Sequence, residues 1–251
     1  MRRFFPVDIL AKEPYSIILG YPNATRRQLK SRLNELKKIG IKAVSFQGPI
    51  LIDKVAVLGK GYTGVVILAK KGTKRVALKI RRTDSPRESM VKEATLLEAA
   101  NKTKVGPRLI ASSDNFVVME YLDGKKIYDW IKSLKGRGRT TKLKSVIKKV
   151  LEDCHSLDMA GLDHGELSNI TKHVIVGKSI TIIDFESSSL KRRVSNVTSA
   201  TQAILIGSGL AKIVRRIYSV PTKEKIIKAL RQYKADQTQK SFDKVLEVLR
   251  L

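Results

Sequence analysis

The chain carries the stretch Leu58-Gly59-Lys60-Gly61-Tyr62-Thr63-Gly64-Val65-Val66, and this stretch decides the fold. Glycines spaced in this way have two common uses. In a dinucleotide-binding fold the third glycine opens a helix, but here it opens Val65-Val66-Ile67-Leu68, a β-branched run that favours a strand. The stretch therefore predicts two strands joined by a glycine-rich loop, whose backbone can approach phosphate oxygens closely because no Cβ intervenes. An ordinary glycine-rich hairpin is the alternative interpretation.

A second motif, Val76-Ala77-Leu78-Lys79, places a lysine at the end of an apolar strand. A buried ammonium group needs an acidic partner or a bound anion. Ser85-Pro86-Arg87-Glu88 predicts a helix start with Ser85 as the N-cap, and on a helix that runs to about Ala100 the carboxylate of Glu93 lies at the edge of the apolar face. We therefore predict an ion pair between Lys79 and Glu93. The alternative is that Lys79 extends into solvent and Glu93 pairs with a lysine of its own helix.

Two acidic residues follow in the second half of the chain. Glu166 lies in His164-Gly165-Glu166-Leu167-Ser168, where a carboxylate can orient an attacking hydroxyl and accept its proton. Asp184 ends the buried run Thr181-Ile182-Ile183, and its oxygens suit a hard cation such as Mg²⁺. Taken alone, Glu166 reads as a surface glutamate and Asp184 as a turn cap. Their order after the glycine-rich stretch favours a nucleotide site, and we predict a structural role for His164, bonded to backbone near Asp184.

The composition limits the class of protein. A chain of 251 residues with a hydrophobic fraction of 42% suits one two-lobed domain or two small ones. The single cysteine, Cys154, excludes an internal disulfide and a cysteine-built zinc site, and it fits a cytoplasmic protein. Charges interrupt the opening apolar patch, so no secretory signal is predicted. The longest uncharged run, 194–211, is rich in polar residues and predicts no membrane span.

The net charge of +27 is a second feature that needs an explanation. The basic excess is spread over 26–42, 132–149 and 191–244. Such an excess attracts polyanions, so RNA or a ribonucleoprotein is a candidate partner. The alternative is a lysine-rich surface that is simply well solvated.

The pattern of apolar residues divides the chain into three parts. Residues 1–50 form an N-terminal helical extension, with a helix from about Ala24 to Ile39 that Asn23 caps and Gly40 ends. This extension either packs on the following lobe or forms a small winged-helix-like unit. Residues 51–121 are β-rich, and residues 122–251 are mainly helical. The predicted strands are 43–46, 50–58, 65–70, 75–80, 109–111, 116–119, 174–176 and 180–183, and the predicted helices of the last part include a long one before His164 and others near 199–218, 223–234 and 241–249.

Together these motifs resemble the protein-kinase-like superfamily over about residues 51–190. They are most similar to small archaeal RIO-type atypical serine/threonine protein kinases, and more distantly to choline kinases and aminoglycoside phosphotransferases. The resemblance implies an α+β fold with two lobes: a β-rich N-lobe with one main helix and a small, mainly helical C-lobe. It also implies that ATP and Mg²⁺ bind in the cleft.

The resemblance assigns a role to each motif. Gly59, Gly61 and Gly64 would cover the phosphates, and Lys79 with Glu93 would grip them. Glu166 would be the catalytic carboxylate, and Asp184 would hold the metal ion. The remaining nucleotide contacts that the resemblance implies are Leu58, Lys60, Val66, Glu120 and Leu122, where Glu120 to Leu122 form the hinge with Met119 behind it.

The chain departs from the family pattern at three positions. Glu166 stands where the family has aspartate, so the carboxylate is longer by one methylene group. The metal-binding asparagine is expected five residues later, where the chain has Thr171. This leaves Asn169, Thr171, His173 and Glu186 as alternatives for the second metal ligand, and we favour Asn169 because of its ligand chemistry. Glu186 replaces the glycine after Asp184 and Phe185.

We therefore expect an ATP- and Mg²⁺-dependent serine/threonine-type kinase that acts on a protein substrate, on a ribonucleoprotein or on itself by autophosphorylation. The alternative is a nucleotide-binding ATPase switch or pseudokinase scaffold, which the three departures favour. A small-molecule kinase is a third interpretation, because the region after Asp184 is short and lacks a peptide-docking segment. The basic excess disfavours it, since such enzymes use acidic pockets for cationic substrates.

Overall fold

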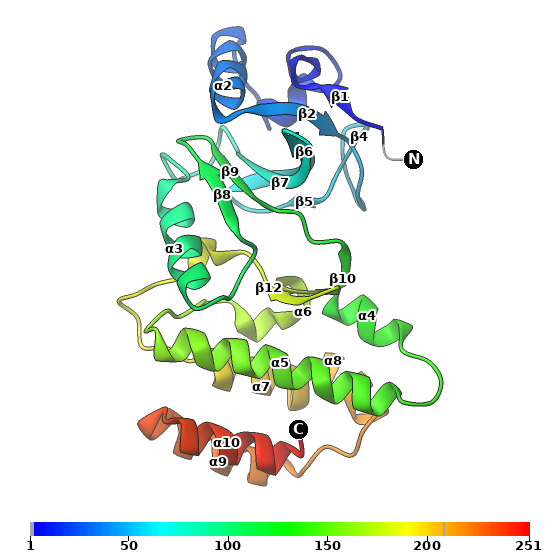
Figure 1. Ribbon diagram of the computed structural model, residues 1–251, viewed down its shortest axis with the longest axis vertical. Coiled ribbons are helices and arrows are strands. Elements are labelled where there is room, and N and C mark those ends of the chain that lie inside the picture. Colours follow the sequence, from blue (N-terminus) through cyan, green and yellow to red (C-terminus); the bar gives the residue numbers. More distant parts are fainter. Residues whose placement is uncertain (1–2, 208) are drawn as a thin grey trace. The chain divides into compact units, whose positions relative to one another are not determined.

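The computed structural model describes residues 3–207 and 209–251 and separates the chain into two compact units (Figure 1). The first unit comprises the chain up to Glu98 together with Pro107–Leu122, and the second comprises Ala99–Gly106 and Asp123–Leu251. Strands dominate the first unit and helices the second, which confirms the predicted α+β class. The division of the chain at residues 50 and 121 stays a prediction.

The first unit is built on one antiparallel sheet. Its strands lie in the order β1 (Phe5–Pro6), β2 (Ile41–Ser45), β6 (Gly64–Lys71), β7 (Lys74–Arg81), β9 (Phe116–Glu120) and β8 (Leu109–Ser112), and β5 (Gly59–Lys60) pairs with β6 beside this path. One face of the sheet carries a core that includes Ile67, Leu78 and Phe116. The predicted strands at 65–70, 75–80, 109–111 and 116–119 are thus confirmed.

The glycine-rich stretch forms the predicted strand–loop–strand unit. Gly59 pairs with Val66 across β5 and β6, and the Gly61 N–H donates to the Gly64 carbonyl at 2.8 Å. A Cβ on Gly64 would lie 3.0 Å from the Ile80 carbonyl oxygen, so the close approach of β7 requires glycine here. The single strand predicted over 50–58 is wrong. Asp53 has a φ of 50° and turns the chain between β3 (Ile50–Ile52) and β4 (Val55–Val57), which form a hairpin of their own.

The N-terminal residues pack on this sheet. They form η1 (Val7–Ala11), α1 (Ser16–Leu19) and α2 (Arg26–Ile39), and Leu33 and Leu36 of α2 share one core with Val44 of β2. The helix ends at Gly40 as predicted, but its N-cap is Thr25 and not Asn23. Thr25 and Gln28 form a reciprocal capping box, in which each side chain accepts a hydrogen bond from the other residue's backbone N–H.

The main helix of this part of the chain begins later than predicted. Helix α3 spans Val91–Lys102, so the predicted start at Ser85 and Pro86 is wrong. Tertiary hydrogen bonds hold the preceding segment as a loop. The Arg87 carbonyl accepts from Arg81 Nη1 at 2.9 Å, and the Met90 N–H donates to the Asp114 carbonyl at 2.9 Å.

The second unit combines a small sheet with helices. Strands β10 (Gly124–Lys126), β11 (Val174–Gly177) and β12 (Ile180–Ile182) pair antiparallel in that order. The helices are α4 (Ile127–Ser133), α5 (Arg139–Met159), α6 (Ile170–His173), α7 (Asn196–Leu205), α8 (Gly209–Arg215), α9 (Lys223–Asp236) and α10 (Gln239–Leu249), with short 3-10 turns η2 (Leu167–Asn169) and η3 (Phe185–Ser187). Helix α5 is the predicted long helix before His164, and it packs against β12 and α7.

The region predicted as one helix over 199–218 differs from the prediction. It contains two helices, α7 and α8, with Ile206 and Gly207 outside both. Within the described ranges 3–207 and 209–251, no single helix is long and apolar enough to span a membrane, whereas α7 and α8 together, bent by 66°, have a sufficient length and composition.

Candidate functional site

The lysine that ends the apolar motif of the first unit, Lys79, is held in a buried ion pair. Lys79 lies on β7 between Val66 of β6 and Val117 of β9, and its Nζ lies 2.7 Å from Glu93 Oε1 on α3. The two side chains are only 5% and 6% exposed. The predicted pairing of Lys79 with Glu93 is therefore present. Because burying two charges is costly unless they are well paired, this arrangement is typical of a lysine held for a specific task.

The other residues predicted to contact the nucleotide lie on the strands β5, β6 and β9 or next to them. The Leu58 N–H donates to the Val66 carbonyl at 2.9 Å, which fixes the entry to the glycine-rich loop. Lys60 Nζ lies 4.6 Å from the centre of the Tyr21 ring. At the other end of the sheet, the Glu120 N–H donates to the Arg108 carbonyl at 2.9 Å, and Leu122 follows two residues later at the end of this unit. Their contacts to a nucleotide stay predictions.

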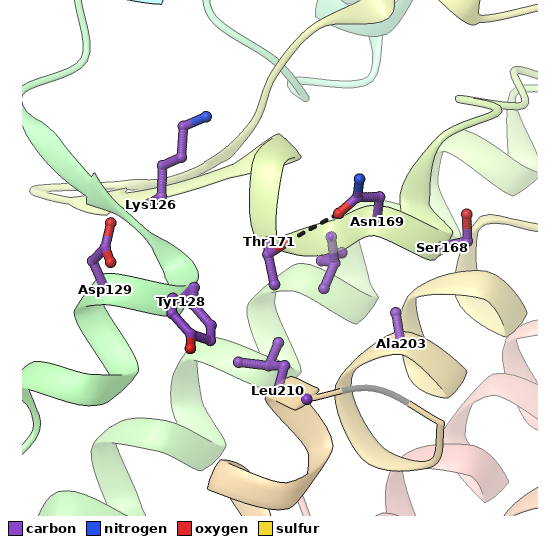
Figure 2. Close-up of a pocket in the computed structure, with 10 residues that line it drawn as sticks. Lys126, Tyr128, Asp129, Ser168, Asn169, Thr171, Ala203 and Leu210 are labelled. Atoms are coloured by element: carbon purple, nitrogen blue, oxygen red, sulfur yellow. Dashed lines mark hydrogen bonds between the residues drawn. The ribbon is translucent and has the colours of Figure 1, made fainter. Parts of the chain in front are cut away.

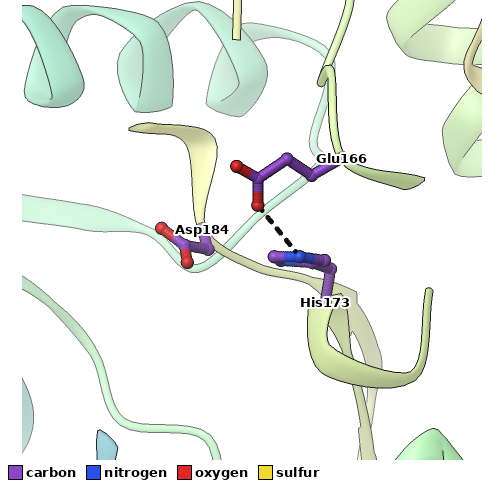
Figure 3. Close-up of side chains that lie close together, drawn as sticks. All are labelled: Glu166, His173 and Asp184. Carbon is purple, nitrogen blue, oxygen red and sulfur yellow. Dashed lines mark ion pairs between the residues drawn. The ribbon is translucent and has the colours of Figure 1, made fainter. Parts of the chain in front are cut away.

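In the second unit, Glu166, His173 and Asp184 lie close together (Figure 3). Glu166 lies in the loop before η2, His173 ends α6, and Asp184 lies between β12 and η3. One ligand atom of each side chain lies within 4.8 Å of the others. Glu166 Oε2 lies 3.1 Å from His173 Nε2, and Glu166 Oε1 accepts from Ser187 Oγ at 2.5 Å. Both carboxylate oxygens of Glu166 are therefore held by neighbouring side chains.

Asp184 has an unusual backbone. Its φ of 72° and ψ of 73° place it in the left-handed region, which non-glycine residues seldom adopt. Such strain persists where the surrounding structure fixes it, and it is common at functional sites. Glu186, another of the predicted alternatives for metal binding, follows in η3 and is buried.

His173 of this cluster and the neighbouring His164 are both buried, and their ring centres lie 5.4 Å apart. His164 Nε2 donates to the Ile183 carbonyl at 3.1 Å, as predicted, and burial together with His173 lowers the pKa of His164 to about 4. Burial also lowers the pKa of His173, although the carboxylates of Asp184 and Glu166 act in the opposite direction. Neutral imidazole is the form that binds metal ions.

These donors fit a divalent cation. Two carboxylates and an imidazole offer oxygen and nitrogen ligands from three directions. Carboxylates suit Mg²⁺ and Mn²⁺, and the imidazole adds a preference for transition metals. The predicted ligand Asn169 ends η2, and its backbone N–H donates to the Glu166 carbonyl at 2.9 Å. Its side-chain Oδ1 accepts from Thr171 Oγ1 at 3.0 Å, and both residues line a pocket of about 380 Å³ with Lys126, Tyr128 and Asp129 (Figure 2). The metal role of Asn169 stays a prediction.

A buried hydrogen-bond network holds the backbone of the segment that leads into Glu166. Asn196 Oδ1 accepts from the His164 N–H at 2.8 Å, and Asn196 Nδ2 donates to Asp158 Oδ1 and to the Leu162 carbonyl, both at 2.8 Å. Tyr233 of α9 donates to Asp158 Oδ2 at 2.9 Å. Burial raises the pKa of Asp158, although these hydrogen bonds act against the rise. The sequence motifs did not indicate Asn196, Asp158, Tyr233 or Ser187, because no short-range spacing connects them to the loop.

Comparison with known proteins identifies the family. A model of the RIO domain matches residues 68–196, which is just over half of the chain. The chain belongs to the RIO family. The match includes Lys79, Glu93, Glu166, His173 and Asp184, whereas the glycine-rich loop lies before it. The fold is accordingly the predicted two-lobed, protein-kinase-like one, and the RIO family comprises atypical kinases and ATPases.

Two curated proteins are similar to about half of this chain. An uncharacterized protein of Methanocaldococcus jannaschii is 30% identical over 116 residues, which cover 46% of this chain and 94% of the relative. The Bacillus subtilis protein named "Putative serine/threonine-protein kinase YrzF" is 25% identical over 115 residues, which cover 46% of this chain and 51% of the relative. The chain thus spans about half the length of the second relative.

Proposed function

We propose that this RIO-family chain is an ATP- and Mg²⁺-dependent serine/threonine-type protein kinase that transfers the γ-phosphate to a hydroxyl group. The observation that carries the proposal is the buried ion pair between Lys79 and Glu93, at 2.7 Å. Lys79 lies on β7, the strand that follows the glycine-rich hairpin of β5 and β6, and Glu93 lies on the helix α3 that comes next. This is the order found in kinases. A cytoplasmic location is part of the same proposal.

Each residue has a defined task in this proposal. Lys79 neutralises the α- and β-phosphates, and Glu93 keeps its ammonium group directed toward them. The backbone N–H groups of the loop at Gly59, Gly61 and Gly64 donate to phosphate oxygens. Glu166 orients the acceptor hydroxyl and takes its proton. Asp184 would hold the metal ion together with a second ligand. The sequence predicts Asn169 as that ligand, whereas the donor set favours His173. A bound metal ion would neutralise charge on the phosphates.

The test of nucleotide binding uses two lysines of one strand. We expect Lys79→Met to weaken ATP binding in the presence of Mg²⁺ at least tenfold, measured by isothermal titration calorimetry. Lys74→Met is the matched control, because Lys74 begins the same strand β7 and is exposed. Equal weakening by both variants, or none by Lys79→Met, would show that general charge rather than this pair binds the nucleotide.

The test of transfer uses labelled ATP and Glu166→Gln. Phosphate transfer to a protein acceptor is expected to fall at least a hundredfold, since general base catalysis contributes about 10²–10⁴-fold. ATP binding should stay unchanged, because the glutamine keeps the size of the side chain. Transfer at the wild-type rate would remove Glu166 from the mechanism.

A second candidate is an ATPase switch or pseudokinase scaffold that acts on a ribonucleoprotein. The observation that favours it is that both oxygens of Glu166 are already bonded, to Ser187 and His173. Fast turnover on a defined hydroxyl substrate would exclude it. The net charge of +27 supports an RNA partner for either function, and a salt titration tests this: phosphate-directed binding weakens steeply as salt rises.

A further inference from the structure

The shortest contact of the proposed catalytic carboxylate is with a hydroxyl of the chain itself. Ser187 Oγ donates to Glu166 Oε1 at 2.5 Å, at the short end of the range for a hydroxyl bonded to a carboxylate. An acceptor hydroxyl must come within hydrogen-bond reach of its base before it can attack. Ser187 already makes that contact, so it lies where an acceptor would lie.

The backbone on both sides keeps the hydroxyl in this place. Ser187 closes the turn η3 that begins directly after Asp184, and the Ser187 carbonyl accepts from Arg192 Nη2 at 2.9 Å. Across from it, a Cβ on Gly165 would lie 2.8 Å from the Ser187 carbonyl oxygen. Because Gly165 has no side chain, the two segments approach closely enough for Ser187 to meet Glu166.

The adjacent serines differ from Ser187. Ser188 is buried, and its Oγ donates to the His164 carbonyl at 3.3 Å. Ser189 Oγ accepts from the backbone N–H groups of Lys191 and Arg192, at 3.1 and 3.2 Å. Among these three consecutive serines, Ser187 directs its hydroxyl at Glu166, and its partly exposed side chain leaves room for modification.

We infer that Ser187 is an acceptor of the chain's own phosphoryl transfer, and therefore a site of autophosphorylation in cis. This inference rests on the proposed function. In the step, a bond forms between Ser187 Oγ and the γ-phosphorus of ATP, and the bond from that phosphorus to the β–γ bridging oxygen breaks. The hydroxyl proton passes to Glu166, and ADP leaves with the electron pair of the broken bond.

The product also limits the reaction. Phosphoserine carries a charge of about −1.5 to −2 at pH 7, and its ester oxygen has no proton to donate to Glu166. The new charge repels the Glu166 carboxylate, so the carboxylate leaves its present position. The side chain of Arg192 is about half exposed and bonds both Asp163 and the Ser187 carbonyl, so its guanidinium lies where it can also pair with the phosphate. We therefore expect one phosphate per chain at this site and slower transfer to other acceptors afterwards.

The experiment incubates the full chain with ATP and Mg²⁺ and locates the phosphate by peptide mass spectrometry. Wild type, Ser188→Ala and Ser189→Ala should carry it on Ser187, and Ser187→Ala should lose at least nine-tenths of the total. Ser187→Thr keeps the hydroxyl and should be phosphorylated at the same position. The fraction modified per minute should not change with protein concentration, because the reaction is intramolecular. Phosphate found on other residues, or full labelling of Ser187→Ala, would overturn the inference.

A second measurement separates this inference from the proposed function. Each variant is also assayed for ATP binding by calorimetry and for transfer to a generic protein acceptor. Transfer to that acceptor without phosphate on Ser187 would overturn the inference and leave the kinase assignment standing. A third outcome is that the wild type carries no phosphate on Ser187 but Ser187→Ala loses transfer to the generic acceptor. That outcome would also overturn the inference, because Ser187 would then be a positioning residue. Failure of the wild type to bind ATP would overturn both.

Discussion

Replacing Asn196 with alanine should loosen the Glu166 loop and destabilise the second unit. Asn196 is 1% exposed, and its side chain makes hydrogen bonds with the His164 N–H, the Leu162 carbonyl and Asp158. Alanine cannot replace any of them. Two backbone groups at the start of the loop would lose a buried partner, and the Asp158 carboxylate would lose a donor.

The contacts give the expected magnitude. A buried polar group that is left without a partner costs about 1–3 kcal/mol, and a hydrogen bond to a charged group is worth about 1.5–3 kcal/mol. Asp158 Oδ1 keeps the Asn196 backbone N–H at 2.9 Å, so its loss is only partial. Taking low to middle values for the three groups, we expect Asn196→Ala to lower the free energy of unfolding by about 3–5 kcal/mol, a large part of the 5–15 kcal/mol that is typical of a domain.

The single tryptophan of the chain, Trp130, makes the assay specific. It lies on α4 in the second unit, so its fluorescence during urea unfolding follows that unit. Gln232→Ala is the control, because Gln232 is exposed on α9 and its loss should change stability by less than about 0.5 kcal/mol. Hydrogen–deuterium exchange of a peptide over 160–168 reports the loop directly. A loss of stability below about 1 kcal/mol, with unchanged exchange in the loop, would refute the reasoning.

Three further predictions concern acid stability, nucleotide binding and metal choice. The pKa of His164 falls from 6.5 to about 4 on folding, so the unfolded chain takes up the proton first. The contribution of His164 to the free energy of unfolding, about 3 kcal/mol, is present above pH 6.5 and is lost as the pH falls toward 4. In urea unfolding between pH 7.5 and 4.5, the free energy of unfolding of His164→Gln should therefore change less with pH than that of the wild type. Glu93→Gln should weaken ATP binding about tenfold by calorimetry, while Glu98→Gln on the exposed side of α3 should not, and equal effects would deny Glu93 a special role. His173→Gln should weaken Mn²⁺ binding, followed by electron paramagnetic resonance without ATP, at least tenfold and Mg²⁺ binding much less; unchanged Mn²⁺ affinity would exclude His173 as a ligand.

Features set by neighbouring residues could be predicted from the sequence. The glycine-rich hairpin follows from three glycines before a β-branched run, and the long helix α5 follows from the periodic apolar residues that it buries. The pairing of Lys79 with Glu93 needed one further assumption, that Glu93 lies on a helix facing the strand. That assumption holds even though α3 starts five residues after Pro86.

Features set by tertiary contacts could not be predicted in this way. Ser85 and Pro86 have the local pattern of a helix start, but hydrogen bonds from Arg81 and to Asp114 hold that segment as a loop. The contacts of Glu166 with Ser187 and of His164 with Asn196 join positions 21 and 32 residues apart, and no periodicity connects them. The cap of α2 is different, because Thr25 and Gln28 have the spacing of a capping box and the sequence did contain that signal.

The glutamate at position 166, where the family resemblance implies aspartate, is best understood with its neighbours. A longer side chain has more rotamers to lose when it is fixed, and ordering a glutamate costs up to about 2 kcal/mol. Here the end of α6 provides His173 for one oxygen, and η3 provides Ser187 for the other, so the carboxylate is held from two sides. His173 and Ser187 thus supply the restraint that the extra methylene group removes. The hydroxyl that restrains Glu166 is the one that we propose as the phosphate acceptor. Positioning of the carboxylate and self-modification would then depend on one residue, and substitutions at Ser187 should affect both.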